Sequence, residues 1–205
     1  MTYKYLLFDL GGVLVDLDFK RSIEAFIELG CPPELFQGEF WSAGIFKEVD
    51  RGTISVEAFY DEIRRIGHLP HVSNDDIMKA WNQIIAGVPE RVFKALIKAR
   101  EQGPIYLLSN VGALHWDLCH QTIMRYQGED ALNWFEKTFA SFELHLLKPE
   151  AAIYRHVIQE TGLRPEDILF IDDRQENLDA AAAEGFQVLL STDHDWIDHL
   201  GFGQL

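Results

Sequence analysis

Three carboxylates of this chain stand directly after apolar segments, where they are candidates for nucleophilic or metal-binding chemistry. Asp9 follows the apolar residues 5–8 and precedes two glycines, whereas Asp172 and Asp173 follow residues 168–171. A strand that leads into a carboxylate and flexible backbone places an anionic group at the edge of a sheet where ligands bind. Asp9 is therefore a candidate nucleophile or metal ligand, although an aspartate before Gly-Gly is also common in simple turns.

Ser109 and Asn110 follow another apolar run, residues 105–108. The carboxyl ends of parallel strands share one edge of a doubly wound sheet, so we expect these polar residues to lie close to Asp9 and to the Asp172-Asp173 pair. Adjacent carboxylates in a partly buried cleft repel each other unless a cation neutralises them. Mg²⁺ prefers oxygen ligands in octahedral geometry, which indicates a site made of Asp9, one carboxylate of the pair and a backbone carbonyl near Gly11. An exposed cap of the helix expected after residue 175 is the simpler alternative for the pair.

Lys148 is the candidate cation for binding a phosphoryl group. Pro149 follows it and favours the start of a helix, which holds the lysine just outside a helix N-terminus. The chain carries a formal net charge of -15, so an anionic substrate requires a local positive charge of this kind. A solvated lysine before a helix is the alternative interpretation.

The order of apolar segments predicts an α/β fold. Apolar runs recur at residues 5–8, 105–108, 138–142, 168–171 and 187–190, and helical patterns separate the later ones. We expect helices from residue 89 to Gly103, from about residue 150 to Gly162 and from about residue 176 to Gly185. This alternation predicts a Rossmann-like, doubly wound parallel sheet that is covered by helices.

Nearly a hundred residues separate the first expected strand from the second, far more than a crossover connection needs. This stretch contains helical patterns and no convincing strand, with Ile84 and Ile85 on the apolar face of its last helix. We therefore expect a helical cap domain at residues 17–86, inserted into a core domain formed by residues 1–16 and 87–205. The hinges are expected near residues 16–18 and 87–89.

Composition and charge limit the classes of binding partner and the cellular locations that we expect. The acidic balance argues against nucleic acid and against an anionic membrane surface, because both bind basic faces. Cys31 and Cys119 lack metal-ligand spacing and indicate free thiols in a reducing compartment. With no apolar stretch near the roughly 20 residues of a membrane span and no signal-peptide pattern at the N-terminus, we expect a cytoplasmic protein. No feature of the sequence specifies its oligomeric state.

The four polar segments, in this order, resemble the motifs of the haloacid dehalogenase-like (HAD) hydrolase superfamily. The resemblance rests on Asp9-Leu10-Gly11-Gly12-Val13, Leu108-Ser109-Asn110, Lys148-Pro149, and Ile171-Asp172-Asp173 with Asn177. It extends over the whole chain, because a helical insertion after the first motif is one of that superfamily's cap types. Residues 9–19 and 148–154 resemble a bacterial sugar-phosphatase branch that includes α-D-glucose-1-phosphatase.

This resemblance implies Mg²⁺-dependent hydrolysis of a small phosphate ester, and in that branch of a sugar phosphate. Asp9 would attack phosphorus and form an aspartyl-phosphate, which water would hydrolyse. Ser109, the N–H of Asn110 and Lys148 would bind the phosphoryl group, and Lys148 would also offset the charge of the nucleophile.

The resemblance also implies the metal ligands. Asp9, the carbonyl of Gly11 and Asp173 would bind Mg²⁺ directly, whereas Asp172 would act through water. Asn177 would support the Asp172-Asp173 pair.

Gly11 departs from the pattern of most phosphatases in this superfamily, which carry a general acid and base two positions after the nucleophile. A positioned acid or base contributes about 10²–10⁴ in rate, so the departure implies a slow enzyme, a good leaving group or a substitute residue. His115 is one candidate substitute because its unperturbed pKa is near 6.5. Asp16 and His145 are the others.

Two other functions remain open at this level. The 2-haloacid dehalogenases of the superfamily also lack the second aspartate, but they need no metal and do not keep an Asp-Asp pair in the fourth motif. Retention of Asp172 and Asp173 therefore favours phosphoryl chemistry. The second alternative is a weakly active protein of the same fold that binds a partner through its cap or its sheet.

Overall fold

A five-stranded parallel sheet forms the centre of the molecule in the computed structural model, which describes residues 3–36 and 44–203. The strand order is β7-β4-β1-β8-β9, and the strands span Tyr5–Phe8 (β1), Ile105–Ser109 (β4), Lys137–Ala140 (β7), Ile168–Asp172 (β8) and Gln187–Leu190 (β9). The predicted α/β fold class, with a Rossmann-like parallel sheet, is confirmed.

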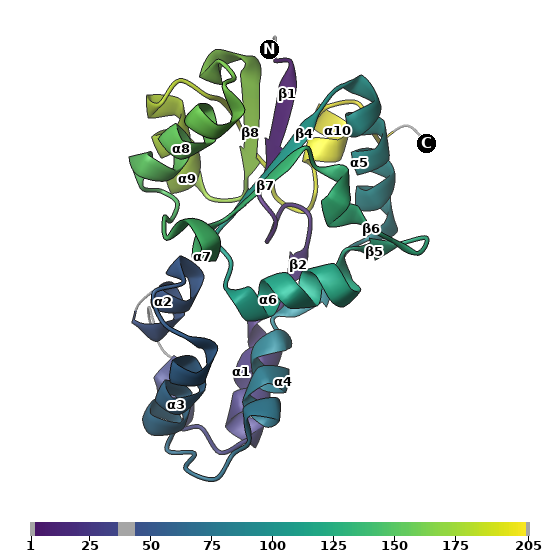
Figure 1. Cartoon of the computed structure of the whole chain (residues 1–205). Helices are drawn as coiled ribbons and strands as arrows, with labels where there is room; N and C mark the ends of the chain where they lie inside the picture. The colour runs from purple at the N-terminus through teal and green to yellow at the C-terminus, as the bar shows by residue number, and fades with distance from the viewer. Residues whose placement is uncertain (1–2, 37–43, 204–205) are drawn as a thin grey trace.

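Helices cover both faces of this sheet (Figure 1). In β1, Leu6 and Phe8 belong to one hydrophobic cluster and Leu7 belongs to the other, as the period-two geometry of a strand requires. Helices α5 (Glu90–Gln102) and α10 (Trp196–His199) pack on the first face. Helices α8 (Ala151–Thr161) and α9 (Gln175–Ala183) pack on the second. These four helices bury strands that are apolar on both sides.

The chain reverses its direction of growth at β1. From β1 it adds β4 and then β7 on one side, after which it returns through α8 to place β8 and β9 on the other side. Such a reversal leaves a crevice at the carboxyl ends of the central strands, where ligands of open α/β sheets bind. The topology thus brings the ends of β1, β4 and β8 together.

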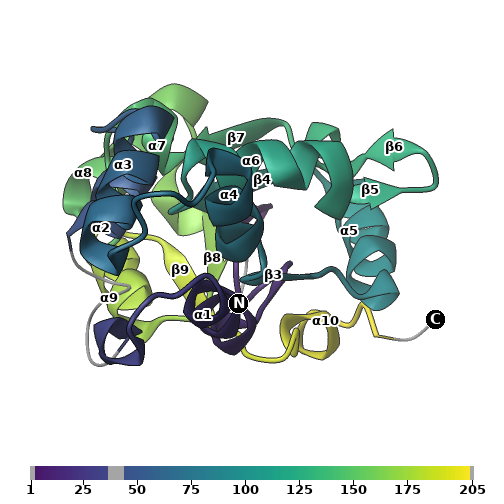
Figure 2. The same ribbon diagram turned by 90° about the horizontal axis from the view of Figure 1, so that it is seen from below.

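The long connection after β1 forms a group of helices with its own hydrophobic cluster, seen below the sheet in Figure 1 and from below in Figure 2. The helices span Phe19–Glu28 (α1), Ile45–Arg51 (α2), Val56–Gly67 (α3) and Asn74–Asn82 (α4). Ser73 caps α4 by accepting a hydrogen bond from the N–H of Asp76.

Shorter elements complete the described chain. They are α6 (Ala113–Leu118), the π-helix Cys119–Ile123, α7 (Ser141–Leu144), the hairpin strands β5 (Arg125–Tyr126) and β6 (Glu129–Asp130), and 3₁₀ turns at Pro33–Phe36, Ala131–Trp134 and Pro165–Asp167. No helix in the described part of the chain is both long and apolar enough to cross a membrane.

Two local predictions were wrong. The strand expected over residues 138–142 ends at Ala140, and Ser141 and Phe142 begin the short helix α7. Residue 85, expected on a helix, lies in strand β3 (Ile85–Gly87), which pairs antiparallel with β2 (Asp16–Leu17). The two connections to the inserted helices run side by side, and this pairing satisfies their backbone hydrogen-bonding groups.

The inserted helices also touch the core at a second place, the contact of α2 with α7. Arg51 donates hydrogen bonds to the Glu150 carboxylate and, over 3.2 Å, to the carbonyl oxygen of His145. Gly52 ends α2 in the left-handed conformation, with φ 67°. A Cβ atom at this position would overlap the carbonyl oxygen of Phe142, so glycine permits the close approach of the two helices.

We predict that Gly52→Ala destabilises the protein more than Gly162→Ala does. Both glycines end helices with φ 67°, but a Cβ on Gly162 meets nothing within 4 Å. Left-handed alanine costs about 1–2 kcal/mol at either site, and the overlap with Phe142 adds to it at Gly52 alone. Urea denaturation measures both losses of unfolding free energy. Equal losses would contradict the close α2–α7 contact.

Candidate active site

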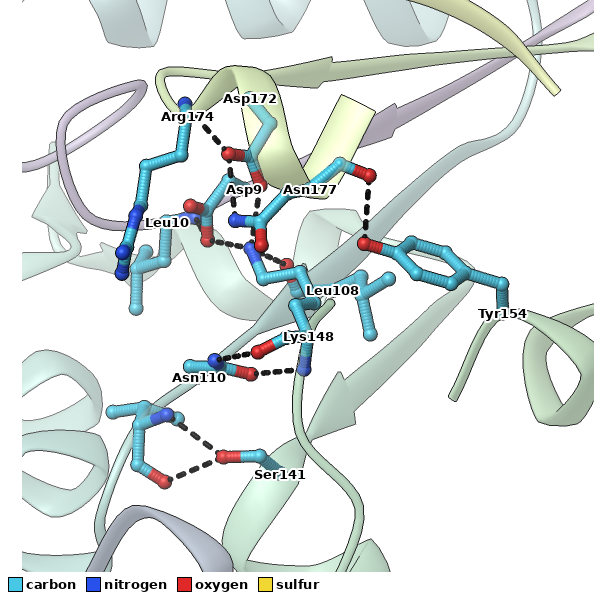
Figure 3. A network of polar contacts seen from close by, with 11 residues as sticks. Asp9, Leu10, Leu108, Asn110, Ser141, Lys148, Tyr154, Asp172, Arg174 and Asn177 are labelled. Carbon is cyan, nitrogen blue, oxygen red and sulfur yellow. Dashed lines mark hydrogen bonds and ion pairs between the residues drawn. The ribbon is translucent and has the colours of Figure 1, made fainter. Parts of the chain in front are cut away.

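The side chain of Lys148 lies at the centre of the polar residues that end the strands (Figure 3). Its Nζ atom is 2.8 Å from Asp9 Oδ1, 2.7 Å from Asp172 Oδ2 and 3.2 Å from the carbonyl oxygen of Leu108. These acceptors match the three protons of an ammonium group. The side chain is almost fully buried. Burial alone lowers the pKa of an amine, but the charges of Asp9 and Asp172 outweigh it and raise the pKa of Lys148.

Asn110 holds the backbone of Lys148 in place. Its Nδ2 donates to the Lys148 carbonyl oxygen over 2.9 Å, and its Oδ1 accepts from the Lys148 N–H over 2.9 Å. This reciprocal pair fastens the end of β4 to the segment before α8. The amide side chain therefore positions the lysine, a function that the motif alone does not reveal.

The Asp172 carboxylate accepts hydrogen bonds from three groups of the protein. Besides Lys148, its carboxylate accepts from the Arg174 N–H over 2.9 Å and from Asn177 Nδ2 over 2.9 Å. Burial opposes the charged form, yet these donors hold the pKa of Asp172 below its usual range. Tyr154 donates to the carbonyl oxygen of Asn177 over 2.8 Å and so holds in place the asparagine that binds Asp172. Asp172 is an ionised anchor for the lysine.

Asp9 directly follows β1, and one of its two carboxylate oxygens accepts hydrogen bonds from the protein. Its Oδ1 accepts from the Leu10 N–H over 2.7 Å and from Lys148, and no described residue donates to Oδ2. Burial raises the pKa of Asp9 to about 7, an effect that Lys148 opposes and that Asp172 and Asp173 reinforce. The carboxylate therefore combines a fixed orientation with an unpaired oxygen.

Asp9, Asp172 and Asp173 form the cluster that suits a metal ion. One carboxylate oxygen from each lies within 4.8 Å of the others. Within residues 3–36 and 44–203, no other residue donates a hydrogen bond to Asp173, whose pKa is raised by burial and by the charge of Asp172. Asn177 Oδ1 is buried without a partner and is available to a metal-bound water. Oxygen-only donors and an orphaned acceptor fit a hard divalent cation such as Mg²⁺.

The two glycines after Asp9 differ in their surroundings. Gly12 has φ 77°, and a Cβ on it would overlap the carboxylate of Asp173. A Cβ on Gly11 would lie 3.0 Å from the end of the Leu17 side chain, which is free to shift. Gly12 therefore lets Asp173 approach the loop after β1, and the backbone of Gly11 lines the cavity beside it.

A cavity of about 850 Å³ opens onto this cluster. The core contributes Asp9, Gly11, Ser109, Asn110, Lys148, Asp173 and Asn177, and the inserted helices and their connections contribute Leu17, Phe46, Lys47, Asp50, Trp81 and Ile85. Ser109 is buried at the end of β4, and its hydroxyl has no partner among the described residues. Most of the residues that the sequence singled out for chemistry thus line one cavity, and Asp172 lies beside it in contact with Lys148.

The candidates for the missing acid are placed differently. His115 lines the cavity, but it stacks on Trp81 at 4.7 Å, and burial lowers its pKa to about 4, so it is neutral at pH 7. Asp16 lies in β2, and its Oδ1 is 2.8 Å from His194 Nε2. His145 contacts the carbonyl oxygen of Arg51. Neither Asp16 nor His145 is among the described residues that line the cavity. Their positions therefore do not support the suggestion that either one replaces the missing acid.

Sequence reasoning missed Asp50 and Ser141. Asp50 lies on the inserted helix α2 and lines the cavity. The Ser141 hydroxyl accepts from the Val111 N–H over 2.9 Å and donates to the carbonyl oxygen of Asp50. These contacts join segments that are 30 and 91 residues apart, and no local pattern in the sequence marks them.

We predict that Gly12→Ala weakens divalent-cation binding more than Gly11→Ala does. The added methyl group at residue 12 displaces Asp173, whereas the one at residue 11 displaces only the flexible end of Leu17. Mg²⁺ should raise the Tm of the wild type, and Gly12→Ala should need about tenfold more Mg²⁺ for half of that rise. Equal Mg²⁺ dependence in the two variants would show that Asp173 is not part of the site.

Residues 3–185 match the family model of the haloacid dehalogenase-like hydrolases. A D-ribitol-5-phosphate phosphatase of Bacteroides thetaiotaomicron is 26% identical over 187 residues, which cover 90% of this chain and 89% of that protein. A sesquiterpene phosphatase of Aspergillus oryzae is 26% identical over 195 residues, covering 94% of this chain and 91% of the relative. The crystal structure of a HAD family enzyme from B. thetaiotaomicron, in complex with magnesium and inorganic phosphate, is 34% identical, with a TM-score of 0.90 and coverage of 97% of this chain and 99% of that one. The chain belongs to the haloacid dehalogenase-like hydrolase family.

Proposed function

We propose that the protein is a Mg²⁺-dependent phosphatase that hydrolyses a small phosphate ester, a sugar phosphate, through an aspartyl-phosphate on Asp9. The observation that carries the proposal is the Lys148 ammonium group between Asp9 and Asp172, which orients Asp9 with one oxygen unpaired. Two relatives of nearly equal length are phosphatases, and a similar structure binds magnesium with phosphate.

Mg²⁺ would be held by Asp9, Asp173 and the carbonyl oxygen of Gly11, with Asp172 acting through a water molecule. Asp172 suits the indirect position because Lys148, Asn177 and the Arg174 N–H already occupy its oxygens. The cation supplies charge neutralisation between the nucleophile and the phosphoryl group when it is bound.

In the first step, the free oxygen of Asp9 attacks phosphorus, and the bond from phosphorus to the ester oxygen breaks. Ser109 and the N–H of Asn110 bind the phosphoryl oxygens as fixed donors, and the positive charge of Lys148 offsets the charge that develops on them. In the second step, water attacks phosphorus, which releases inorganic phosphate and restores the Asp9 carboxylate. Gly11 provides no acid for the leaving oxygen, a feature compatible with the anomeric oxygen of a sugar, which is less basic than an ordinary alcohol.

Residues 17–86 are proposed to act as the cap domain, and residues 1–16 and 87–205 as the core. The cavity supports this division, because its polar floor comes from strand ends and much of its apolar wall comes from the inserted helices. A wall of this kind excludes water from the phosphoryl group while the substrate is bound. The cytoplasmic location and the absence of nucleic acid and membrane partners stay predictions.

Initial rates of phosphate release test the reaction, the nucleophile and the metal together. The wild type should hydrolyse members of a panel of sugar phosphates, nucleoside monophosphates and acyl phosphates in the presence of Mg²⁺, and a chelator should abolish this. Asp9→Asn should lower the rate by at least about 10³-fold because the amide is not a nucleophile. Asp117→Asn is the matched control, since Asp117 is exposed outside the cavity.

Two results would contradict the proposal. Halide release from 2-chloropropionate that survives the chelator would indicate a dehalogenase. No turnover on the whole panel, with Mg²⁺ present, would indicate a binding protein of the same fold.

Binding of Mg²⁺ should weaken on acidification. Because burial raises the pKa of Asp9 to about 7, a proton competes with the cation for this carboxylate near neutral pH. Between about pH 8 and pH 6, the Mg²⁺ concentration for half of the Tm rise should increase, approaching a tenfold change per pH unit below the pKa. A concentration that is constant over this range would contradict the raised pKa of Asp9.

A further inference from the structure

Asp50 brings a carboxyl group from the inserted helices to the cavity that contains Asp9. It lies near the end of α2, and its neighbours on the cavity wall include Phe46 and Trp81, which stack on each other at 4.9 Å. The other charged residue that α2 contributes to this wall is Lys47, which is exposed. Asp50 itself is partly buried.

The backbone of Asp50 is tied to the loop that follows β4. Its carbonyl oxygen accepts from the Ser141 hydroxyl, which in turn accepts from the Val111 N–H over 2.9 Å. Gly112 leaves room for α2 at this place, because a Cβ on it would overlap Val49 and would lie 3.5 Å from Asp50 Oδ1. The carboxyl group is therefore held beside the loop that begins at Ser109 and Asn110.

The carboxyl group of Asp50 lacks a partner. Within the described residues, no side chain or N–H donates a hydrogen bond to it, and no cation forms an ion pair with it. The adjacent Arg51 binds Glu150 instead. Burial, which no nearby cation offsets, raises the pKa of Asp50 to about 7. The half-buried carboxyl group lines the cavity and is therefore placed to accept hydrogen bonds from a bound ligand.

We propose that Asp50 selects the leaving group of the substrate, by accepting hydrogen bonds from the hydroxyl groups of a polyol or sugar monophosphate. This proposal rests on the phosphatase function proposed above. The substrate has two ends of different chemistry, and the cavity has two matching ends. Lys148 and the strand ends bind the phosphate, whereas a carboxyl group beside Gly112 repels phosphate and accepts from hydroxyls.

The two phosphatase relatives have leaving groups of opposite polarity, a polyol in one and a sesquiterpene in the other. A terpenyl chain offers no donor and would leave Asp50 desolvated and unpaired. Sites built to hydrogen-bond a substrate hydroxyl reject analogues that lack it by large factors, because their polar groups then stay unsatisfied. Asp50 therefore favours the polyol class over the terpenyl class.

Steady-state kinetics of the Mg²⁺-loaded enzyme test the proposal with D-ribitol-5-phosphate, farnesyl phosphate and p-nitrophenyl phosphate. The measured quantity is the ratio of kcat/KM for ribitol phosphate to that for p-nitrophenyl phosphate, from which the fraction of folded enzyme cancels. Asp50→Leu should lower this ratio by about tenfold or more, mainly through KM, as expected for one lost hydrogen bond to a charged group. Asp50→Asn keeps one acceptor oxygen and should lower it less.

Glu48→Gln is the matched control, because it removes an exposed carboxylate from the same helix outside the cavity, and it should keep the ratio within about twofold. An unchanged ratio in both Asp50 variants, or a wild type that prefers farnesyl phosphate, would overturn the selection by Asp50 while the phosphatase function stands. A wild type that releases phosphate from none of the three esters would overturn the selection by Asp50, and the sugar-phosphate panel described above would then decide whether the phosphatase function stands.

Discussion

The structure of the site depends on one interaction, the burial of the Lys148 ammonium group between Asp9 and Asp172. Three acidic groups at one edge of a sheet repel one another, and burial by itself would neutralise them. The lysine reverses this for Asp172, whose pKa is lowered, and opposes it for Asp9. Asn110 fixes the lysine backbone, and Asn177 and Tyr154 fix its anionic partner. These polar side chains are all arranged so that one cation stays charged inside the protein.

The inserted helices extend this arrangement to the other end of the cavity. They are joined to the core by the β2–β3 pair and by the contact of α2 with α7, where Ser141 links Asp50 to the loop after β4. One serine hydroxyl thus ties the backbone of Asp50 to Val111 in the loop that follows β4. In the function that we propose, the Asp50 carboxyl group at one end of the cavity faces the hydroxyl groups of the substrate, and Lys148 at the other end faces its phosphate.

Much of the core and its site was predictable from sequence because parallel strands align their carboxyl ends. The apolar runs that precede Asp9, Ser109 and Asp172 were sufficient to predict that these side chains lie close together. The error at residues 138–142, where the strand ends at Ala140, did not affect this prediction. The missed features depend on contacts between distant segments. The pairing of β2 with β3 satisfies backbone groups that only the folded chain brings together. In the sequence, Asp50 cannot be distinguished from any other acidic residue of an amphipathic helix. Only the folded chain shows that α2 lies against Gly112 and that Asp50 lines the cavity.

The most direct test of the account is mass spectrometry of the peptide that contains Asp9, after rapid acid quench of a reaction with Mg²⁺ and a hydrolysed sugar phosphate. We expect a phosphoryl group on Asp9 during turnover, because Lys148 orients this carboxylate and no described residue donates a hydrogen bond to its other oxygen. Lys148→Met should reduce the trapped fraction. Release of phosphate without any phosphorylation of Asp9 would contradict the account.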